Sequence, residues 1–150
     1  MEETLTGETE CEESALRARA GVLLAQLGVD DHANASAGFS SREIATTVRR
    51  TLDLPEIAEL RPRLQPEFWV YAESDAERTL SLTAGVADAV ALDEAGRIKV
   101  VIDWKSDVDP APGVVEQYRA QVRDYLAATG AQFGLIVFMT SRRIVRVDIR

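Results

Sequence analysis

A short, fully apolar run near the end of the chain constrains the fold more than any other feature. Residues 132–140, centred on Leu135-Ile136-Val137-Phe138, lack the alternation of a strand with one wet face. Such a run predicts a central strand that is buried on both faces. It follows an amphipathic segment, 114–129, and Gly130, which together predict a helix with a glycine C-cap. A buried strand preceded by such a helix indicates an α/β fold, in which helices pack against a sheet.

Further strand signals complete the expected sheet. Upstream, segments rich in aromatic and β-branched residues are expected as strands at 68–71, 80–92 and 97–104. Because the segment 93–96 suits a hairpin turn, we expect an antiparallel meander there. A last strand is expected at 144–149, where apolar residues alternate. The predicted class is therefore α/β: a mixed sheet of a three-strand antiparallel meander, a crossover helix and further strands, flanked by helices.

The N-terminal part of the sequence has a different pattern. Residues 1–12 are acidic and are expected to form a disordered leader. We expect residues 13–150 to form a single domain, with a helical part at about 13–62 and a core at about 66–150. Cap residues and apolar periodicity indicate two helices in the helical part, one from Ser14 to about Gly28 and one from Ser40 or Ser41 to Leu52.

Composition excludes several classes of protein. A hydrophobic fraction of 46% and a charged fraction of 28% are those of an ordinary globular chain, not of a disordered or collagen-like one. No apolar run approaches the roughly 18 residues that a membrane span needs, and the acidic start is unlike a secretory signal. The single cysteine, Cys11, excludes an intramolecular disulfide and a cysteine-rich zinc module. We therefore expect a cytoplasmic protein with no membrane partner.

The distribution of charge is uneven. A net charge of −8 argues mildly against a nucleic-acid partner. Residues 116–150, however, hold six arginines against three acids, and arginine suits bidentate contact with phosphate. Arg142 and Arg143, expected in a turn, are either simply solvated or contacts for a DNA backbone. The chain has only two lysines, Lys99 and Lys105, so genome composition explains the arginine preference equally well, and charge alone decides nothing.

Two acids lie inside the expected strands. Asp88 lies within an apolar run, and Asp103 follows Val100-Val101-Ile102. Burying an acid there is costly unless a cation or hydrogen bonds compensate it. Because adjacent antiparallel strands bring the two carboxylates close together, they would either repel or bind a divalent cation, Mg²⁺ or Mn²⁺ rather than zinc. Lys105 lies two residues beyond Asp103, on the same strand face, so the pattern suits metal-assisted phosphodiester hydrolysis; a plain exposed ion pair is the alternative.

Three segments in succession resemble the motifs of a known family. They are Gly85-Val86-Ala87-Asp88, Ile102-Asp103-Trp104-Lys105-Ser106-Asp107 and Tyr118-Arg119-Ala120-Gln121-Val122-Arg123-Asp124-Tyr125. In this order they resemble the PD-(D/E)XK nuclease superfamily, which implies a restriction-endonuclease-like core. The Gln-x-x-x-Tyr on the helix is typical of the RecB/AddA-like branch, found at the C-terminus of UvrD-type helicase-nucleases. The resemblance covers about half of the chain, 67–140.

The resemblance implies a role for each matching residue. Four groups would hold the metal: the carboxylates of Asp88 and Asp103, the main-chain carbonyl of Trp104, and Glu67 at the head of the first strand. Lys105 would be catalytic, together with the two aspartates. Three residues of the helix would hold the substrate strand or brace the site: Gln121, Tyr125 and Tyr118.

The same resemblance implies a partner and leaves one residue without a match. It implies a metal-dependent DNA nuclease domain that belongs to, or is a partner of, a helicase in double-strand-break repair or recombination. The sequence has no G-x-x-x-x-G-K-[ST] motif, so the helicase would lie in a longer chain or in a separate protein. The single histidine, His32, lies in a loop-like stretch without the Gly-x-x-x-His context that related nucleases use for metal binding, and we expect it at the surface.

Three alternatives remain at this stage. A degenerate nuclease fold would bind DNA or dock a protein without cutting, although the retained acids and lysine argue against it. A stand-alone restriction-type endonuclease would cut DNA alone, although Gln121 and Tyr125 argue against it. An acidic interaction domain with no nucleic-acid role would require the three motifs to be coincidental.

Overall fold

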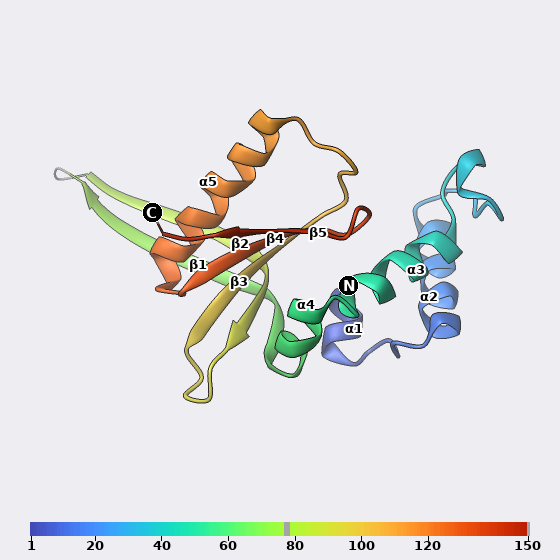
Figure 1. Ribbon diagram of the computed structural model, residues 1–150, viewed down its shortest axis with the longest axis horizontal. Helices are drawn as coiled ribbons and strands as arrows, with labels where there is room; N and C mark the ends of the chain where they lie inside the picture. The colour runs from blue at the N-terminus through green and yellow to red at the C-terminus, as the bar shows by residue number, and fades with distance from the viewer. Residues whose placement is uncertain (77–78, 150) are drawn as a thin grey trace. The chain divides into compact units, whose positions relative to one another are not determined.

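The chain forms two compact units. The structure is a computed structural model that describes residues 1–76 and 79–149 (Figure 1). The units are Met1–Glu59 and Leu60–Arg150. The sequence predicts a single domain over 13–150, with its change of pattern between residues 62 and 66. In the structure the division falls slightly earlier, and it separates a helical unit from a unit built on a sheet.

The N-terminal unit is helical. In chain order its elements are α1 (Glu2–Thr6), α2 (Glu13–Gln26), the 3-10 turn η1 (Ala35–Ala37), α3 (Ser41–Leu52) and α4 (Pro55–Leu60), which ends at the unit boundary. Helices α2 and α3 pack against each other. The apolar residues that they bury are Leu16, Ala20, Leu24, Ala45 and Leu52. The two helices predicted from periodicity are confirmed.

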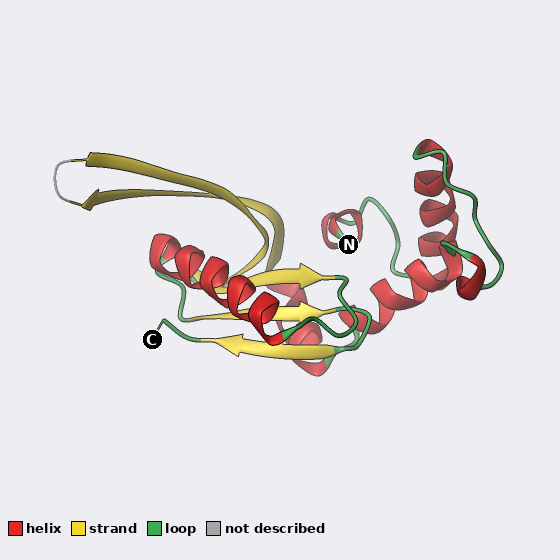
Figure 2. Ribbon diagram, turned by 90° about the horizontal axis from the view of Figure 1, so that it is seen from above, coloured by secondary structure: helices red, strands yellow, loops and turns green. Residues whose placement is uncertain are grey.

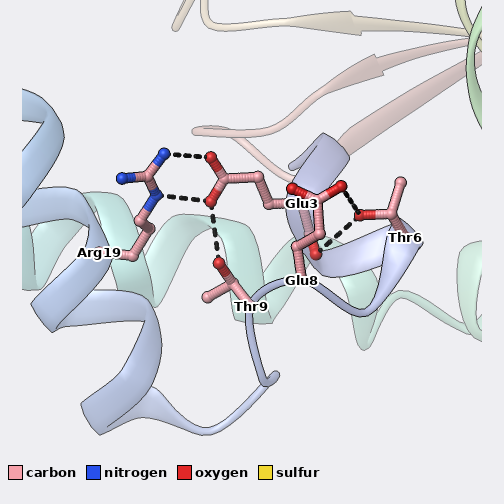
Figure 3. Close-up of polar contacts among 5 residues, drawn as sticks. All are labelled: Glu3, Thr6, Glu8, Thr9 and Arg19. Atoms are coloured by element: carbon pink, nitrogen blue, oxygen red, sulfur yellow. Dashed lines mark hydrogen bonds and ion pairs between the residues drawn. The ribbon is translucent and has the colours of Figure 1, made fainter.

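The first twelve residues, expected from composition as a disordered leader, include a short helix in the structure. They contain α1, which ends at Gly7 in a left-handed conformation (φ 81°). The Glu3 carboxylate accepts two hydrogen bonds from the Arg19 guanidinium, one of them from Nε at 2.6 Å, and a third from the Thr9 hydroxyl at 2.9 Å (Figure 3). These bonds, with Arg19 foremost, lower the pKa of Glu3 from 4.5 to about 2. These contacts join α1 and the residue Thr9 to α2.

The C-terminal unit contains one mixed sheet of five strands. After the turn η2 (Arg61–Arg63), these are β1 (Leu64–Ala76), β2 (Thr79–Leu92), β3 (Ile98–Lys105), β4 (Phe133–Phe138) and β5 (Arg143–Val147), in the order β1-β2-β3-β4-β5. All neighbours are antiparallel except β3 and β4, which are parallel. Helix α5 (Pro112–Thr129) connects this parallel pair. The predicted α/β class, meander and crossover helix are therefore confirmed.

The core of this unit lies between α5 and the sheet. Figure 2 shows α5 lying along one face of the strands, while β1 and β2 continue as a long two-stranded ribbon. Val122 and Leu126 of α5 are fully buried against the sheet. Gly134 of β4 allows this close approach, because a Cβ there would collide with the Val122 side chain. The predicted buried strand is confirmed, since β4 buries every residue from Gly134 to Phe138.

No helix within residues 1–76 and 79–149 is both long enough and apolar enough to cross a membrane.

Candidate active site

The two acids of the motif lie where β2 and β3 stop pairing. The ladder between these strands runs as far as Ala89 opposite Ile102, so the next opposed positions are Asp88 and Asp103. Beyond that pair, the Asp88 side chain takes the place of a main-chain hydrogen-bond acceptor: its Oδ2 accepts a hydrogen bond from the Trp104 amide at 2.7 Å. Asp88 is thereby fixed at the point of divergence, next to Asp103.

Asp103 is a buried carboxylate with one unused oxygen. Asp103 is only 3% exposed to solvent. Oδ1 accepts a hydrogen bond from Lys105 Nζ at 2.8 Å, whereas Oδ2 is buried and has no hydrogen-bond partner among the described residues. Burial raises the pKa of Asp103; Lys105 opposes this shift, and the nearby Asp88 carboxylate reinforces it. The site therefore holds more negative charge than its own lysine balances.

Lys105 is held from two sides. Besides its ion pair with Asp103, its ammonium nitrogen lies over the ring of Tyr118, 4.5 Å from the ring centroid, a cation–π arrangement. The Tyr118 hydroxyl donates a hydrogen bond to Asp107 Oδ2 at 3.1 Å. Burial, followed by the Asp107 carboxylate, raises the pKa of Tyr118. Tyr118 therefore links Lys105 to the segment that follows β3. The position of Asp107 in the motif did not indicate that it accepts this hydrogen bond from Tyr118.

Hydrogen bonds from the residues after β4 fix the end of β3. The Met139 amide donates a hydrogen bond to the Lys105 carbonyl at 2.8 Å, and the Thr140 hydroxyl donates one to the Ser106 carbonyl at 3.1 Å. These bonds tie the residues after β4 to the backbone around the lysine. The lysine therefore projects from a rigid strand end rather than from a loose loop.

Helix α5 braces β2 on the other side of the acids. The Tyr125 hydroxyl donates a hydrogen bond to the Val86 carbonyl at 3.1 Å, and the exposed Gln121 amide donates one to the same hydroxyl at 3.3 Å. The Tyr125 ring lies close to Gly85, where an added Cβ would come within 2.9 Å of the ring. Glycine at this position is thus needed for the contact. Tyr125 fixes the strand two residues before Asp88, and Gln121 faces solvent above it.

Glu67 lies opposite Asp88 in the register of β1 and β2. Its neighbours form the pairs Pro66–Ala89 and Phe68–Ala87, and Glu67 takes the position between them. Its φ of 49° is left-handed, which is uncommon for a residue other than glycine. The side chain is exposed. The register thus aligns Glu67, Asp88 and Asp103 across β1, β2 and β3.

The site's donors suit a hard cation but do not form a complete cage. Within residues 1–76 and 79–149, no group of three or more His, Cys, Asp or Glu side chains gathers as a metal site. The unpartnered Oδ2 of Asp103, beside a second carboxylate, is nevertheless the kind of oxygen that Mg²⁺ takes. Because Mg²⁺ usually keeps several waters and needs only one or two carboxylates, the residues present fit that metal.

Three other residues that the sequence singled out lie outside the cluster around Asp103. His32 lies in the N-terminal unit, half-buried, with its ring against Gly38 and its amide bonded to the Phe39 carbonyl at 2.8 Å. Arg143 lies over the Phe138 ring, 4.5 Å from its centroid, so it covers the core. Arg142 is exposed in the turn before it, at a φ of 55°.

Comparisons with known proteins add little to this geometry. No protein-family model and no curated protein matches the sequence. Among solved structures, the crystal structure of SSO0001 is similar, with a TM-score of 0.49 and 20% sequence identity, over 89% of this chain and 61% of that one. The chain thus spans less than two thirds of that protein. Function has to be argued from the site itself.

Proposed function

We propose that the C-terminal unit is a Mg²⁺-dependent DNA nuclease domain with a restriction-endonuclease-like core. The observation that carries this proposal is the arrangement around Asp103: a buried carboxylate with one oxygen on Lys105, the other without a partner, and Asp88 beside it. Asp88 and Asp103 would hold the metal, with the Trp104 carbonyl and Glu67 as further candidates. A bound Mg²⁺ supplies Lewis-acid stabilisation of charge on a phosphodiester, and Mn²⁺ can substitute for it.

Lys105 has the position and the donors to act on the reacting phosphate. An ammonium group has three N–H donors, and one is used by Asp103. The remaining donors can orient an attacking water or hydrogen-bond a phosphate oxygen as charge develops there. Because the Tyr118 ring and the ion pair fix the ammonium from two sides, little reorganisation is needed for this role.

The residues of α5 would serve the site in two ways. Tyr125 would hold β2, and hence Asp88, in register through its bond to Val86. Gln121, exposed on the same helix face, donates one N–H to the Tyr125 hydroxyl and would hydrogen-bond the substrate strand through the other groups of its amide. Two carboxylates repel a polyanion unless a cation reverses the local charge, so we expect DNA binding to depend on divalent metal. A helicase module, in the same natural chain or in another, is the partner that this assignment implies.

Cleavage assays with metal controls test the proposal. Linear and circular DNA, single- and double-stranded, should be cut with Mg²⁺ or Mn²⁺ and left intact with EDTA. Asp103→Asn should lose cleavage, whereas Asp124→Asn, an exposed carboxylate of α5, should keep it. Absence of cleavage by folded wild type with either metal and all four substrates contradicts the proposal.

A further inference from the structure

Asp107, the acid that follows β3, has no role in the proposed cleavage, yet it is connected with Lys105. It lies two residues beyond the lysine and is half-buried. Its Oδ2 accepts a hydrogen bond from the Tyr118 hydroxyl at 3.1 Å. The ammonium nitrogen of Lys105 lies over the ring of the same tyrosine, 4.5 Å from the ring centroid. The connection between the acid and the lysine thus runs through Tyr118.

The backbone just before Asp107 is held to the residues that follow β4. The Lys105 carbonyl accepts a hydrogen bond from the Met139 amide at 2.8 Å, and the Ser106 carbonyl accepts one from the Thr140 hydroxyl at 3.1 Å. These bonds anchor the two residues that precede Asp107. Its carboxylate therefore joins an anchored strand end to α5, the helix that carries Tyr118.

The Tyr118 ring has a second neighbour, which holds it from the sheet. The Phe138 ring of β4 lies 6.3 Å away between centroids, with the two planes tilted by 50°. Packing against one ring limits the place of the tyrosine, whereas a directional hydrogen bond at its far end sets the direction in which the side chain points. Burial, followed by Asp107, raises the pKa of Tyr118, so the hydroxyl keeps its proton and remains a donor.

We propose that Asp107 is a positioning residue for Lys105, which it places by orienting the Tyr118 ring against the ammonium group. This inference rests on the proposed nuclease function, in which Lys105 meets the reacting phosphate. Two contacts then define the place of the ammonium: Asp103 Oδ1 at 2.8 Å and the face of the ring. A hydroxyl that donates to a carboxylate is polarised by it, so Asp107 also strengthens the negative ring face that attracts the cation.

NMR spectra of the lysine side chains test the proposal without requiring cleavage. The chain has two lysines, so protein made with isotope-labelled lysine gives one set of signals for Lys105 and one for Lys99, the internal control. Because a ring face shields the nuclei above it, the ε-methylene signals of Lys105 should lie upfield in wild type. Tyr118→Leu should remove this shift, and Asp107→Ala and Tyr118→Phe should each reduce it. Asp107→Asn, which keeps an acceptor oxygen, should retain most of it.

A double variant separates this positioning role from a general structural one. Because both substitutions break the same hydrogen bond, adding Asp107→Ala to Tyr118→Phe should change neither the Lys105 signals nor the cleavage rate any further. In single-turnover cleavage, each single substitution should lower the maximal rate by about 10- to 100-fold, as expected for a group that orients a reacting residue, with KM little changed. Asp109→Ala, which alters an exposed acid two residues further on, should match wild type in both measurements.

Unchanged Lys99 signals show that a variant has kept its fold. The positioning role is overturned if wild type shows no upfield shift of Lys105, if Asp107→Ala leaves that shift unchanged, or if the effects of Asp107→Ala and Tyr118→Phe add. Failure of the nuclease proposal looks different: the Lys105 signals still respond to Asp107→Ala, yet wild type cuts no DNA with Mg²⁺ or Mn²⁺.

Discussion

Replacing Asp103 by asparagine should abolish the response of the protein to divalent cations. In the structure Lys105 engages Oδ1, and Oδ2 is buried without a hydrogen-bond partner among the described residues. A carboxylate offers this second oxygen, with charge, to a hard cation, whereas asparagine offers one neutral oxygen and an NH₂ group. We therefore expect Ca²⁺, a cation that takes oxygen ligands, to stabilise the wild type but not Asp103→Asn.

The size of this effect follows from linkage. A cation that binds only the folded state stabilises it by about 2.7 kcal/mol when its free concentration is a hundredfold above Kd. For a domain the size of the C-terminal unit, each kcal/mol raises the midpoint of thermal unfolding by about 4–8 °C, so the full shift is on the order of 10–20 °C. Burying the unpartnered oxygen of Asp103 costs about 1–3 kcal/mol. A cation that binds this oxygen would offset that cost, which favours binding to the folded state.

Thermal unfolding followed by circular dichroism measures the shift directly. Wild type, Asp103→Asn and Asp124→Asn are melted in EDTA and across a Ca²⁺ series. The Asp124→Asn variant, which alters an exposed carboxylate of α5, should shift like wild type. The reasoning is refuted if the Asp103→Asn midpoint rises as far as that of wild type, or if the wild-type midpoint does not move.

Three further predictions concern the supports of the site and of the N-terminal unit. Tyr125→Phe removes the bond to Val86 and should lower the free energy of unfolding by about 0.5–1.5 kcal/mol, measured by urea denaturation, with slower cleavage; unchanged stability contradicts the bracing role. Gly85→Ala places a Cβ against the Tyr125 ring and should destabilise the protein in the same assay, but not in a Tyr125→Leu background. For Glu3, the folded pKa of about 2 lies below the ordinary value of 4.5, so its pairing with Arg19 stabilises the folded state above pH 4.5 and is lost as pH falls toward 2. Glu3→Gln should therefore unfold more readily than wild type at pH 6, with the gap closing between pH 4.5 and 2; a gap that is constant with pH contradicts this.

The strand pattern was predictable because its signals are local. The apolar run at 132–140 predicts a strand that is buried on both faces, and β4 is indeed buried from Gly134 to Phe138. The extent of β1 was not predictable, since it runs from Leu64 to Ala76 whereas the pattern indicates only 68–71. Pro66 and the polar residues 73–75 have low strand propensity, and their strand conformation depends on pairing with β2.

The acids of the site were accessible to sequence reasoning, but their supports were not. Asp88 and Asp103 stand out because they interrupt apolar strands. The bond from the Trp104 amide to Asp88 and that from Tyr118 to Asp107 depend on where two strands diverge and on how α5 crosses them. Neither the divergence of the strands nor the crossing of α5 produces a pattern in the nearby sequence. The same holds for the pairing of Glu3 with Arg19, which joins residues sixteen positions apart in the sequence.

Comparing alanine variants of Lys105 and Lys99 tests most directly whether Lys105 acts on the reacting phosphate in a metal-dependent cleavage. Single-turnover cleavage of labelled single-stranded DNA at saturating Mg²⁺ is measured for wild type, Lys105→Ala and Lys99→Ala, which removes the only other lysine in the chain. A positioned donor at the reacting phosphate is worth about 10²–10³ in rate. The account predicts a loss of that order in Lys105→Ala and a wild-type rate in Lys99→Ala. Equal rates for Lys105→Ala and wild type, or cleavage that persists in EDTA, would contradict it.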